Sequence, residues 1–329
     1  MKKLFLLIAI LLTLTGCVSY KELNDIGIIT AIGIDYSNNK YILTFSMLTP
    51  SEENKEKRTI YKTEDANIET CFNNIYNVST KKAYLAHTDL LILSNNIKKE
   101  NYDDIFNLFL NRPDSRNSFN VIILENYNKD IFKINTDEIN NLLKVSNEES
   151  SLIKPITLDE VIKNVLELNI SYIPVLKDNK KLELIGYKSI YEDNNKLTSK
   201  ESLALNFIRN DINQTLITVD NTSYQVNTSN TTLSINKNNI DINIISELTL
   251  LDEKQNNNKD INNYKDYIKQ IINEFLTSQN LNYFYNKIYK YDYNYAKNHE
   301  NYDINFTINV EVSINKNTNI KGGNPFAKK

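Results

Sequence analysis

The chain has 329 residues, of which 38 are lysine or arginine and 41 are aspartate or glutamate, so its formal net charge is −3. This slightly acidic balance argues against the strongly basic surface that a nucleic-acid-binding protein needs, and we expect no nucleic-acid partner. The length exceeds what one hydrophobic core usually organises and is sufficient for two or three domains.

The first segment has the features of a bacterial lipoprotein signal. Two lysines precede an apolar run at residues 4–14, which is much shorter than the roughly 20 residues needed to cross a bilayer. The run ends in LTGC at residues 14–17 and resembles the lipobox, in which a diacylglycerol is attached to the cysteine thiol before cleavage in front of it. We therefore expect a signal peptide at 1–16 and an S-diacylglycerol cysteine at Cys17, whose amino group can also be acylated. The alternative is an ordinary secreted protein whose signal ends near a cysteine.

Lipidation of Cys17 has consequences for the rest of the chain. Two acyl chains hold a protein stably on a membrane, whereas one chain holds it only marginally. Removal of residues 1–16 takes away two lysines and changes the formal charge from −3 to −5. Cys71 then has no partner for an intramolecular disulfide, and its place in an apolar helical stripe indicates a small buried hydrophobe rather than a nucleophile.

The first half of the mature chain alternates between strand and helix patterns. Two β-rich runs separated by turn-forming residues predict a hairpin, at 26–35 and 41–47. The patterns that follow predict a polar loop at 51–58, a helix at 64–78, a strand at 84–93, a helix at 103–110 and a strand at 119–124. Such alternation is typical of a mixed α/β domain.

Two capping boxes predict where later helices begin. Thr157 precedes Glu160, and Thr198 precedes Glu201, by the spacing that lets each pair of side chains satisfy the free amides at a helix start. The sequence between them predicts two strands, at 172–176 and 182–191.

The remaining sequence predicts a second α+β unit. Polar β-rich runs lie at 214–219, 222–227, 231–236 and 240–250, and helical patterns lie at 260–276 and 281–296. The closing segment at 302–314 alternates strictly between apolar and polar residues. This period of two indicates one buried and one solvent-facing side, and it favours an antiparallel setting.

Together these patterns predict an α+β fold, with two to three mixed α/β domains and largely antiparallel sheets flanked by helices. We expect the signal peptide at 1–16, one or more N-terminal domains at 17–195, and a C-terminal α+β domain at 196–329 that ends in a long strand.

The sequence offers no arrangement of residues for catalysis, for a cofactor or for a metal. Its two histidines, His87 and His299, and one remaining thiol are too few for a usual zinc site. No nucleophile elbow, phosphate loop or metalloprotease motif is present. The acidic pairs at 103–104 and 148–149 point to different sides of their elements and are interpreted as structural or solvating. We therefore predict that the chain is not an enzyme.

Two further features leave alternatives open. His87 precedes an apolar strand and is either a hydrogen-bonded structural histidine or a pH-sensitive polar contact. Tyrosines are dense between residues 283 and 295. They form either a recognition surface, since tyrosine gives large contact area at low entropic cost, or a partly buried helix face.

The mature chain resembles the Ger(x)C spore-germination lipoproteins, the C subunits of nutrient germinant receptors in endospore-forming bacteria. The resemblance rests on Cys17, residues 21–25 and 31–35, the histidine-then-apolar-strand segment at 83–93, Gly186 in a hairpin of the N-terminal half, the helix at 260–276 and the strand at 302–314. Val18 stands where the family usually has tryptophan.

This resemblance implies a non-enzymatic receptor subunit that is required for spore germination. It implies assembly with the integral membrane A and B subunits and a lipid anchor on the outer face of the inner spore membrane. The alternative is a solute-binding lipoprotein of a membrane importer, which requires two similar α/β lobes around a cleft. A cell-wall hydrolase is a third class, weakened by the missing acid/base arrangement.

Overall fold

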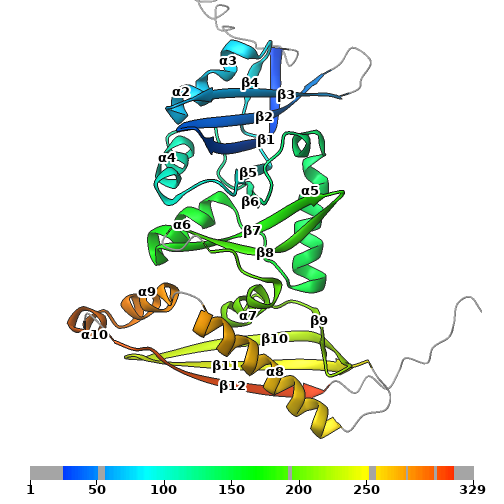
Figure 1. The fold of residues 1–329 in the computed structure, drawn as a ribbon, viewed down its shortest axis with the longest axis vertical. Coiled ribbons are helices and arrows are strands. Elements are labelled where there is room, and N and C mark those ends of the chain that lie inside the picture. The colour runs from blue at the N-terminus through cyan, green and yellow to red at the C-terminus, as the bar shows by residue number, and fades with distance from the viewer. Residues whose placement is uncertain are drawn as a thin grey trace, which may run out of the picture.

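The protein contains two β-sheets arranged one after the other along its long axis (Figure 1). The computed structural model describes residues 25–50, 56–191, 195–251, 257–278, 281–299 and 302–314. The first sheet has eight strands, with β4 paired to β1 beside the path β3-β2-β1-β5-β6-β7-β8. Its strands are β1 (Ile26–Ser37), β2 (Lys40–Pro50), β3 (Glu56–Asp65), β4 (Lys82–Tyr84), β5 (Leu90–Ser94), β6 (Asn120–Leu124), β7 (Ile170–Asn179) and β8 (Lys181–Tyr191).

Long antiparallel hairpins form both sides of the first sheet, and short parallel strands form its centre. β1, β2 and β3 pair antiparallel, as do β7 and β8, whereas β1, β5, β6 and β7 are parallel neighbours. β5 is buried along its whole length and β6 along nearly all of it, because parallel strands are covered on both faces and therefore read as continuous apolar runs.

Helices cover both faces of this sheet. The side chains of Val121 and Ile123 in β6 pack in one cluster with α2 (Ile68–Asn73), α3 (Ile75–Val78), α4 (Lys99–Leu110) and α6 (Leu158–Leu168). The alternate residues Ile122 and Leu124 pack in the other cluster, with the 3₁₀ helix η2 (Asp130–Lys133) and α5 (Thr136–Val145). A single π-helical turn, η3 (Ser146–Ser150), follows α5.

The second sheet has four strands in the order β12-β11-β10-β9. Its strands are β9 (Thr215–Val219), β10 (Thr222–Asn236), β11 (Asn239–Leu250) and β12 (Asn305–Ile314), and the helices beside it are α7 (Ser199–Arg209), α8 (Asn257–Ser278), α9 (Asn282–Tyr291) and α10 (Tyr293–Asn298). Figure 1 shows α7 between the two sheets and α8 across the second. One continuous apolar cluster contains Ile122 of the first sheet, Phe207 of α7 and Ile242 of the second sheet. The two sheets are therefore joined by a shared core.

The closing strand corrects one prediction. Its two faces do differ, since Val310 is buried while Asn309 and Glu311 are exposed. However, β12 pairs in parallel with β11, so the antiparallel setting was wrong. Helices α8 to α10 return the chain to the end of the sheet at which β11 starts. Because β12 begins at that same end, it runs parallel to β11. The alternation arises because β12 is an edge strand with one covered face.

Elements in the first half of the chain also differ from the predicted ones. The loop expected at 51–58 lies partly outside the described residues. Its last residues belong to the edge strand β3, whose charged side chains resemble those of a solvent-exposed loop. The helix expected at 64–78 begins only at Ile68, where the Asn67 side chain accepts the amide of Thr70 at 3.0 Å. The strand expected at 84–93 is divided into β4 and β5 by a turn in which the amide of Thr88 donates to the carbonyl of Leu85 at 2.9 Å.

Both capping boxes are confirmed. The amide of Thr157 donates to Oε2 of Glu160 at 2.9 Å, and the amide of Glu160 donates back to Oγ1 of Thr157 at 3.4 Å. At the start of α7 the corresponding distances between Thr198 and Glu201 are 2.8 and 3.2 Å. These contacts satisfy amides that have no partner within the helix.

Candidate functional site

The predicted lipid site, Cys17, lies outside the described residues, so its modification stays a prediction. The described part of the chain starts at Asp25 and enters β1 at once. Figure 1 shows β1 and its hairpin partners at one end of the long axis, opposite the second sheet. Within the described ranges, no helix has the length and apolar character that crossing a membrane would require.

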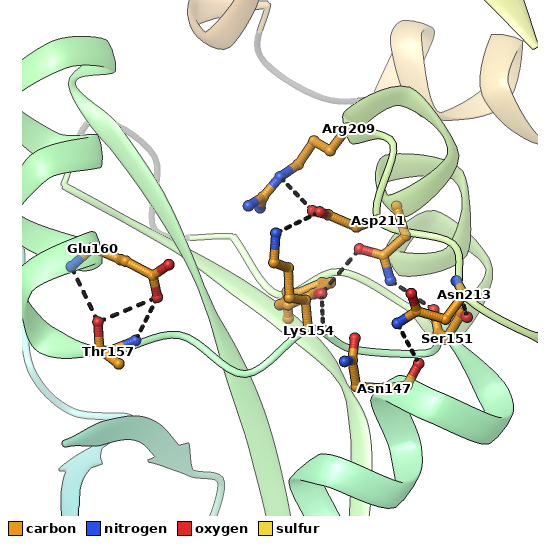
Figure 2. Close-up of polar contacts among 10 residues, drawn as sticks. Asn147, Ser151, Lys154, Thr157, Glu160, Arg209, Asp211 and Asn213 are labelled. Carbon is orange, nitrogen blue, oxygen red and sulfur yellow. Dashed lines mark hydrogen bonds and ion pairs between the residues drawn. The ribbon is translucent and has the colours of Figure 1, made fainter. Parts of the chain in front are cut away.

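A second candidate site lies where the two sheets meet, at the carboxyl end of α7. Arg209 is the last residue of this helix, and Asn210 ends it with a left-handed backbone at φ 62°. That turn brings the Asp211 carboxylate back beside Arg209. Oδ2 of Asp211 lies 3.2 Å from Nε of Arg209, and Oδ1 accepts Nζ of Lys154 at 2.7 Å (Figure 2).

A buried hydrogen-bond network holds this junction in place. The Asn206 amide donates to the carbonyls of Ser151 and Leu152 at 2.7 and 3.1 Å. Its oxygen accepts the hydroxyl of Tyr187 at 2.9 Å, and that hydroxyl accepts the amide of Lys154. Burial raises the pKa of Tyr187 to about 12, so the hydroxyl keeps its proton at physiological pH.

The same network extends to the segment that leads into the second sheet. The Ser151 hydroxyl donates to the carbonyl of Gln214 at 2.9 Å and accepts the amide of Asn213 at 3.0 Å. The Asn213 side chain donates to the carbonyl of Asn147 at 3.1 Å (Figure 2). The segment before α6, the end of α7 and the approach to β9 are therefore fixed to one another by satisfied polar contacts, which favours a single geometry over a loose connection.

Two cavities of about 190 and 200 Å³ adjoin this junction and share Asn164, Tyr172 and Arg209. We call them together the junction groove. Its other lining residues are Lys154, Pro155, Ile156, Glu160 and Lys163 in the first cavity and Leu168, Ile170, Tyr283 and Lys287 in the second.

Helix α9 closes one side of the junction groove and is fixed to α6 by polar contacts. Nζ of Lys290 lies 2.7 Å from Oε2 of Glu167, and the Asn286 amide donates to the carbonyl of Leu168 at 2.6 Å. Tyr283 and Lys287 on α9 are thereby held opposite α6.

Charge in the junction groove is predominantly positive. Burial opposes the charge on Arg209, but Asp211 and the neighbouring tyrosines outweigh it and raise the pKa of this guanidinium above its usual range. Its side chain is 18% exposed, and its Cζ lies 6.0 Å from the ring centre of Tyr172. Arg209 is therefore a fixed cation on the wall of the groove.

The contribution of the Asp211 ion pairs to stability can be tested by substitution. Asp211→Asn keeps the shape of the side chain but leaves Arg209 and Lys154 without their shared carboxylate. Because Asp211 is 7% exposed, we expect a loss of stability on the order of 2 kcal/mol, between the values typical of exposed and fully buried pairs. This should lower the midpoint of thermal unfolding, followed by circular dichroism, by roughly 5 °C.

The control for this variant is Glu274→Gln, which removes an ion pair to Lys200 whose side chains are 43% and 47% exposed. Exposed pairs contribute little, so its midpoint should stay near that of the unmodified protein. Equal midpoints for the two variants would contradict the role given to Asp211.

The other residues considered from the sequence lie apart from this groove. Cys71 is fully buried, burial raises the pKa of its thiol, and its Sγ donates to the carbonyl of Tyr41 at 3.4 Å, as expected of a small buried hydrophobe. His87 is exposed, with its ring 5.7 Å from that of Tyr84. His299 stacks on Tyr295 at 4.3 Å. No cluster of metal-ligating side chains occurs among the residues that the structure describes.

The structure also shows the environments of the acidic pairs and of the tyrosine cluster. Asp104 accepts the hydroxyl of Tyr41 at 2.6 Å, which is a structural contact, and residues 148–149 are exposed in η3. Of the tyrosines, Tyr283 is buried in the groove, whereas Tyr289 and Tyr291 are 53% and 69% exposed. The cluster is thus divided between a buried and an exposed face.

Comparison with known proteins relates this chain to spore germination proteins. A family profile described as the spore germination protein N-terminal domain matches residues 19–178. Spore germination protein KC of Bacillus subtilis (strain 168) is 27% identical over 106 residues, which are 29% of this chain and 26% of that protein. The crystal structure of the GerBC protein superposes with a TM-score of 0.54 at 15% identity and covers 86% of this chain and 96% of that chain. Together these matches support a Ger(x)C family protein.

These matches differ in what they establish. At 15% identity the likeness to the GerBC protein shows the fold, and it includes most of both chains. The matched part of this chain spans about a quarter of the length of protein KC. The predicted α+β fold is confirmed.

Proposed function

We propose that this chain is the C subunit of a spore nutrient germinant receptor, and that it acts without catalysing a reaction. The observation that supports this best is the match of the spore germination N-terminal domain to residues 19–178, joined to a fold shared with the GerBC protein over 86% of the chain. The relatives are spore germination proteins and are not known enzymes.

The second part of the proposal is a lipid anchor at Cys17. A diacylglyceryl group would hold the first hairpin of the protein close to the membrane, because only a short segment separates Cys17 from β1 at Ile26. The second sheet, at the other end of the long axis (Figure 1), would then project away from the lipid. The membrane face would be the outer face of the inner spore membrane.

The third part concerns the partners. We expect the integral membrane A and B subunits of the receptor, since a tether that confines the protein to their membrane raises its effective concentration for them. Within this arrangement we keep the division into a region at 17–195 and a region at 196–329. It falls between the first sheet and α7.

The importer alternative requires two similar lobes around a cleft. The two sheets here have eight and four strands and different strand orders, so they do not form such a pair.

Deletion of the gene, followed by scoring spores against a panel of nutrients, tests the proposed role. We expect loss of response to at least one nutrient and its recovery when the unmodified gene is returned. Unchanged responses to every nutrient, in a strain without another copy of this receptor subunit, would contradict the proposal.

A further inference from the structure

The junction groove contains more positive charge than its neighbourhood neutralises. Four cations, Lys154, Lys163, Arg209 and Lys287, lie around it. Two carboxylates, Glu160 in the lining and Asp211 at its edge, oppose them. The groove therefore has a net charge of +2.

The two carboxylates already have partners. Oε2 of Glu160 accepts the amide and the hydroxyl of Thr157 in the capping box. Asp211 uses one oxygen for Lys154 and the other for Nε of Arg209. Among the described residues, Lys163 and Lys287 make no ion pair, and Lys287 instead lies with Nζ 5.2 Å from the ring centre of Tyr283.

Arg209 lines both cavities. Asp211 occupies its Nε side, and Figure 2 shows the terminal nitrogens of the guanidinium pointing away from that carboxylate. A guanidinium in this setting presents a pair of donors in the fixed geometry that suits a carboxylate or phosphate. Partial burial, with 18% of the side chain exposed, strengthens such a contact because the local dielectric constant is lower than in bulk water.

The size and lining of the junction groove restrict the ligand. Each cavity, of about 190 or 200 Å³, is smaller than the roughly 300–1,000 Å³ of pockets for drug-sized molecules. Apolar surface from Ile156, Leu168 and Ile170 lies beside the cations. A small oxyanion with up to two negative charges therefore fits both the volume and the charge.

We propose that the junction groove is a binding site for a small dianionic oxyanion, a short dicarboxylate or a phosphate, held by Arg209 and flanked by Lys163 and Lys287. The bound anion would connect α6 and α9 to the end of α7, at the point where the two sheets meet. This site goes beyond the receptor role and does not depend on it.

Isothermal titration of the full chain in detergent, with succinate and separately with inorganic phosphate at constant ionic strength, tests the proposal. We expect saturable binding of at least one of the two anions. Binding of succinate alone would assign a dicarboxylate, and binding of phosphate alone would assign a phosphate. Saturable binding of neither would overturn the proposal.

Variants of the lining residues distinguish a specific anion site from non-specific electrostatic attraction of the anion to the protein surface. Arg209→Lys keeps the charge and loses the paired donors, and we expect at least tenfold weaker binding. Lys163→Gln and Lys287→Gln should each weaken binding about threefold, because a flanking charge adds less than a direct partner. Lys144→Gln is the control, since Lys144 is exposed on α5, outside the lining of the groove, and its affinity should equal that of the unmodified protein.

Folding of each variant is checked by thermal unfolding before titration. Lys163 is exposed, so its replacement leaves the fold intact even if the Arg209 variant unfolds. If Lys163→Gln and Lys287→Gln both bind the anion as tightly as Lys144→Gln, the proposed site is wrong.

Discussion

Replacing Cys17 by alanine should move nearly all of the protein from the membrane fraction of spores to the soluble fraction. Each buried CH₂ of an acyl chain contributes about 0.8 kcal/mol to membrane binding, so the loss of two chains removes the anchor. The expected consequence is the loss of the nutrient responses that depend on this receptor. Fractionation with immunoblotting measures the first effect, and germination assays measure the second.

The other cysteine supplies the matched control. Cys71 is fully buried in the first sheet's core, so Cys71→Ala removes a thiol without touching the anchor and should leave the protein on the membrane. Mass spectrometry of the N-terminal peptide should show Cys17 as the first residue, carrying a diacylglyceryl group. An unmodified N-terminus, or a Cys17→Ala protein that still pellets with membranes and supports full germination, would exclude the anchor.

Gly186→Ala should strongly destabilise the first sheet. Gly186 has φ +128°, which an L-residue rarely adopts, and it lies beside a β-bulge in the β7–β8 hairpin. An added Cβ would lie 2.5 Å from Oγ of Ser202 and 2.8 Å from the carbonyl oxygen of Leu197. Backbone strain and these overlaps together should cost roughly 3 kcal/mol.

Thermal unfolding measures this effect, with an expected fall in the midpoint of roughly 6–12 °C. Ser202→Ala is the control, because it removes the hydrogen bond from the Tyr187 amide at 3.1 Å and the one that the Ser202 hydroxyl donates to the Thr198 carbonyl at 2.8 Å, without adding a Cβ at position 186, and it should cost about 1–2 kcal/mol. Combining both substitutions should recover only part of the loss, since the Leu197 carbonyl remains in the way. A Gly186→Ala protein that unfolds at the midpoint of the unmodified chain would contradict the packing described for this hairpin.

Local sequence signals predicted many of the elements well. The β1–β2 hairpin, the helix starts at Thr157 and Thr198, and the buried stripe of α8 follow from patterns a few residues long. Such patterns report the turn chemistry and the exposure of neighbouring positions. They therefore predict where an element begins and which face it buries.

The pairing of β12 could not be predicted in the same way. The alternation in residues 305–314 indicates that one face of the strand is covered. An edge strand of a sheet that is covered on one face has this pattern whether it is parallel or antiparallel to its neighbour. The direction depends on the path through α8 to α10, which returns the chain before β12. Likewise β3 carries many charged residues because it is the outer strand of its sheet, and charged edge strands discourage association with other sheets.

The cavities of the junction groove had no local signal in the sequence. Lys163 comes from α6, Tyr172 from β7, Arg209 from α7 and Lys287 from α9, so only the tertiary fold brings them together. One cue was present in retrospect: Arg209 and Asp211 flank a left-handed residue at the end of a helix. That arrangement predicts a local ion pair, but not the cavities around it.

Isolation of the protein from detergent-solubilised inner spore membranes tests the central claim most directly. An affinity tag at the carboxyl end of the unmodified chain, and the same tag on the Cys17→Ala variant, would be compared by quantitative mass spectrometry after mild cross-linking. We predict recovery of two integral membrane germinant-receptor subunits with the lipidated chain and their loss with the variant. Recovery of an importer permease in their place would contradict the account.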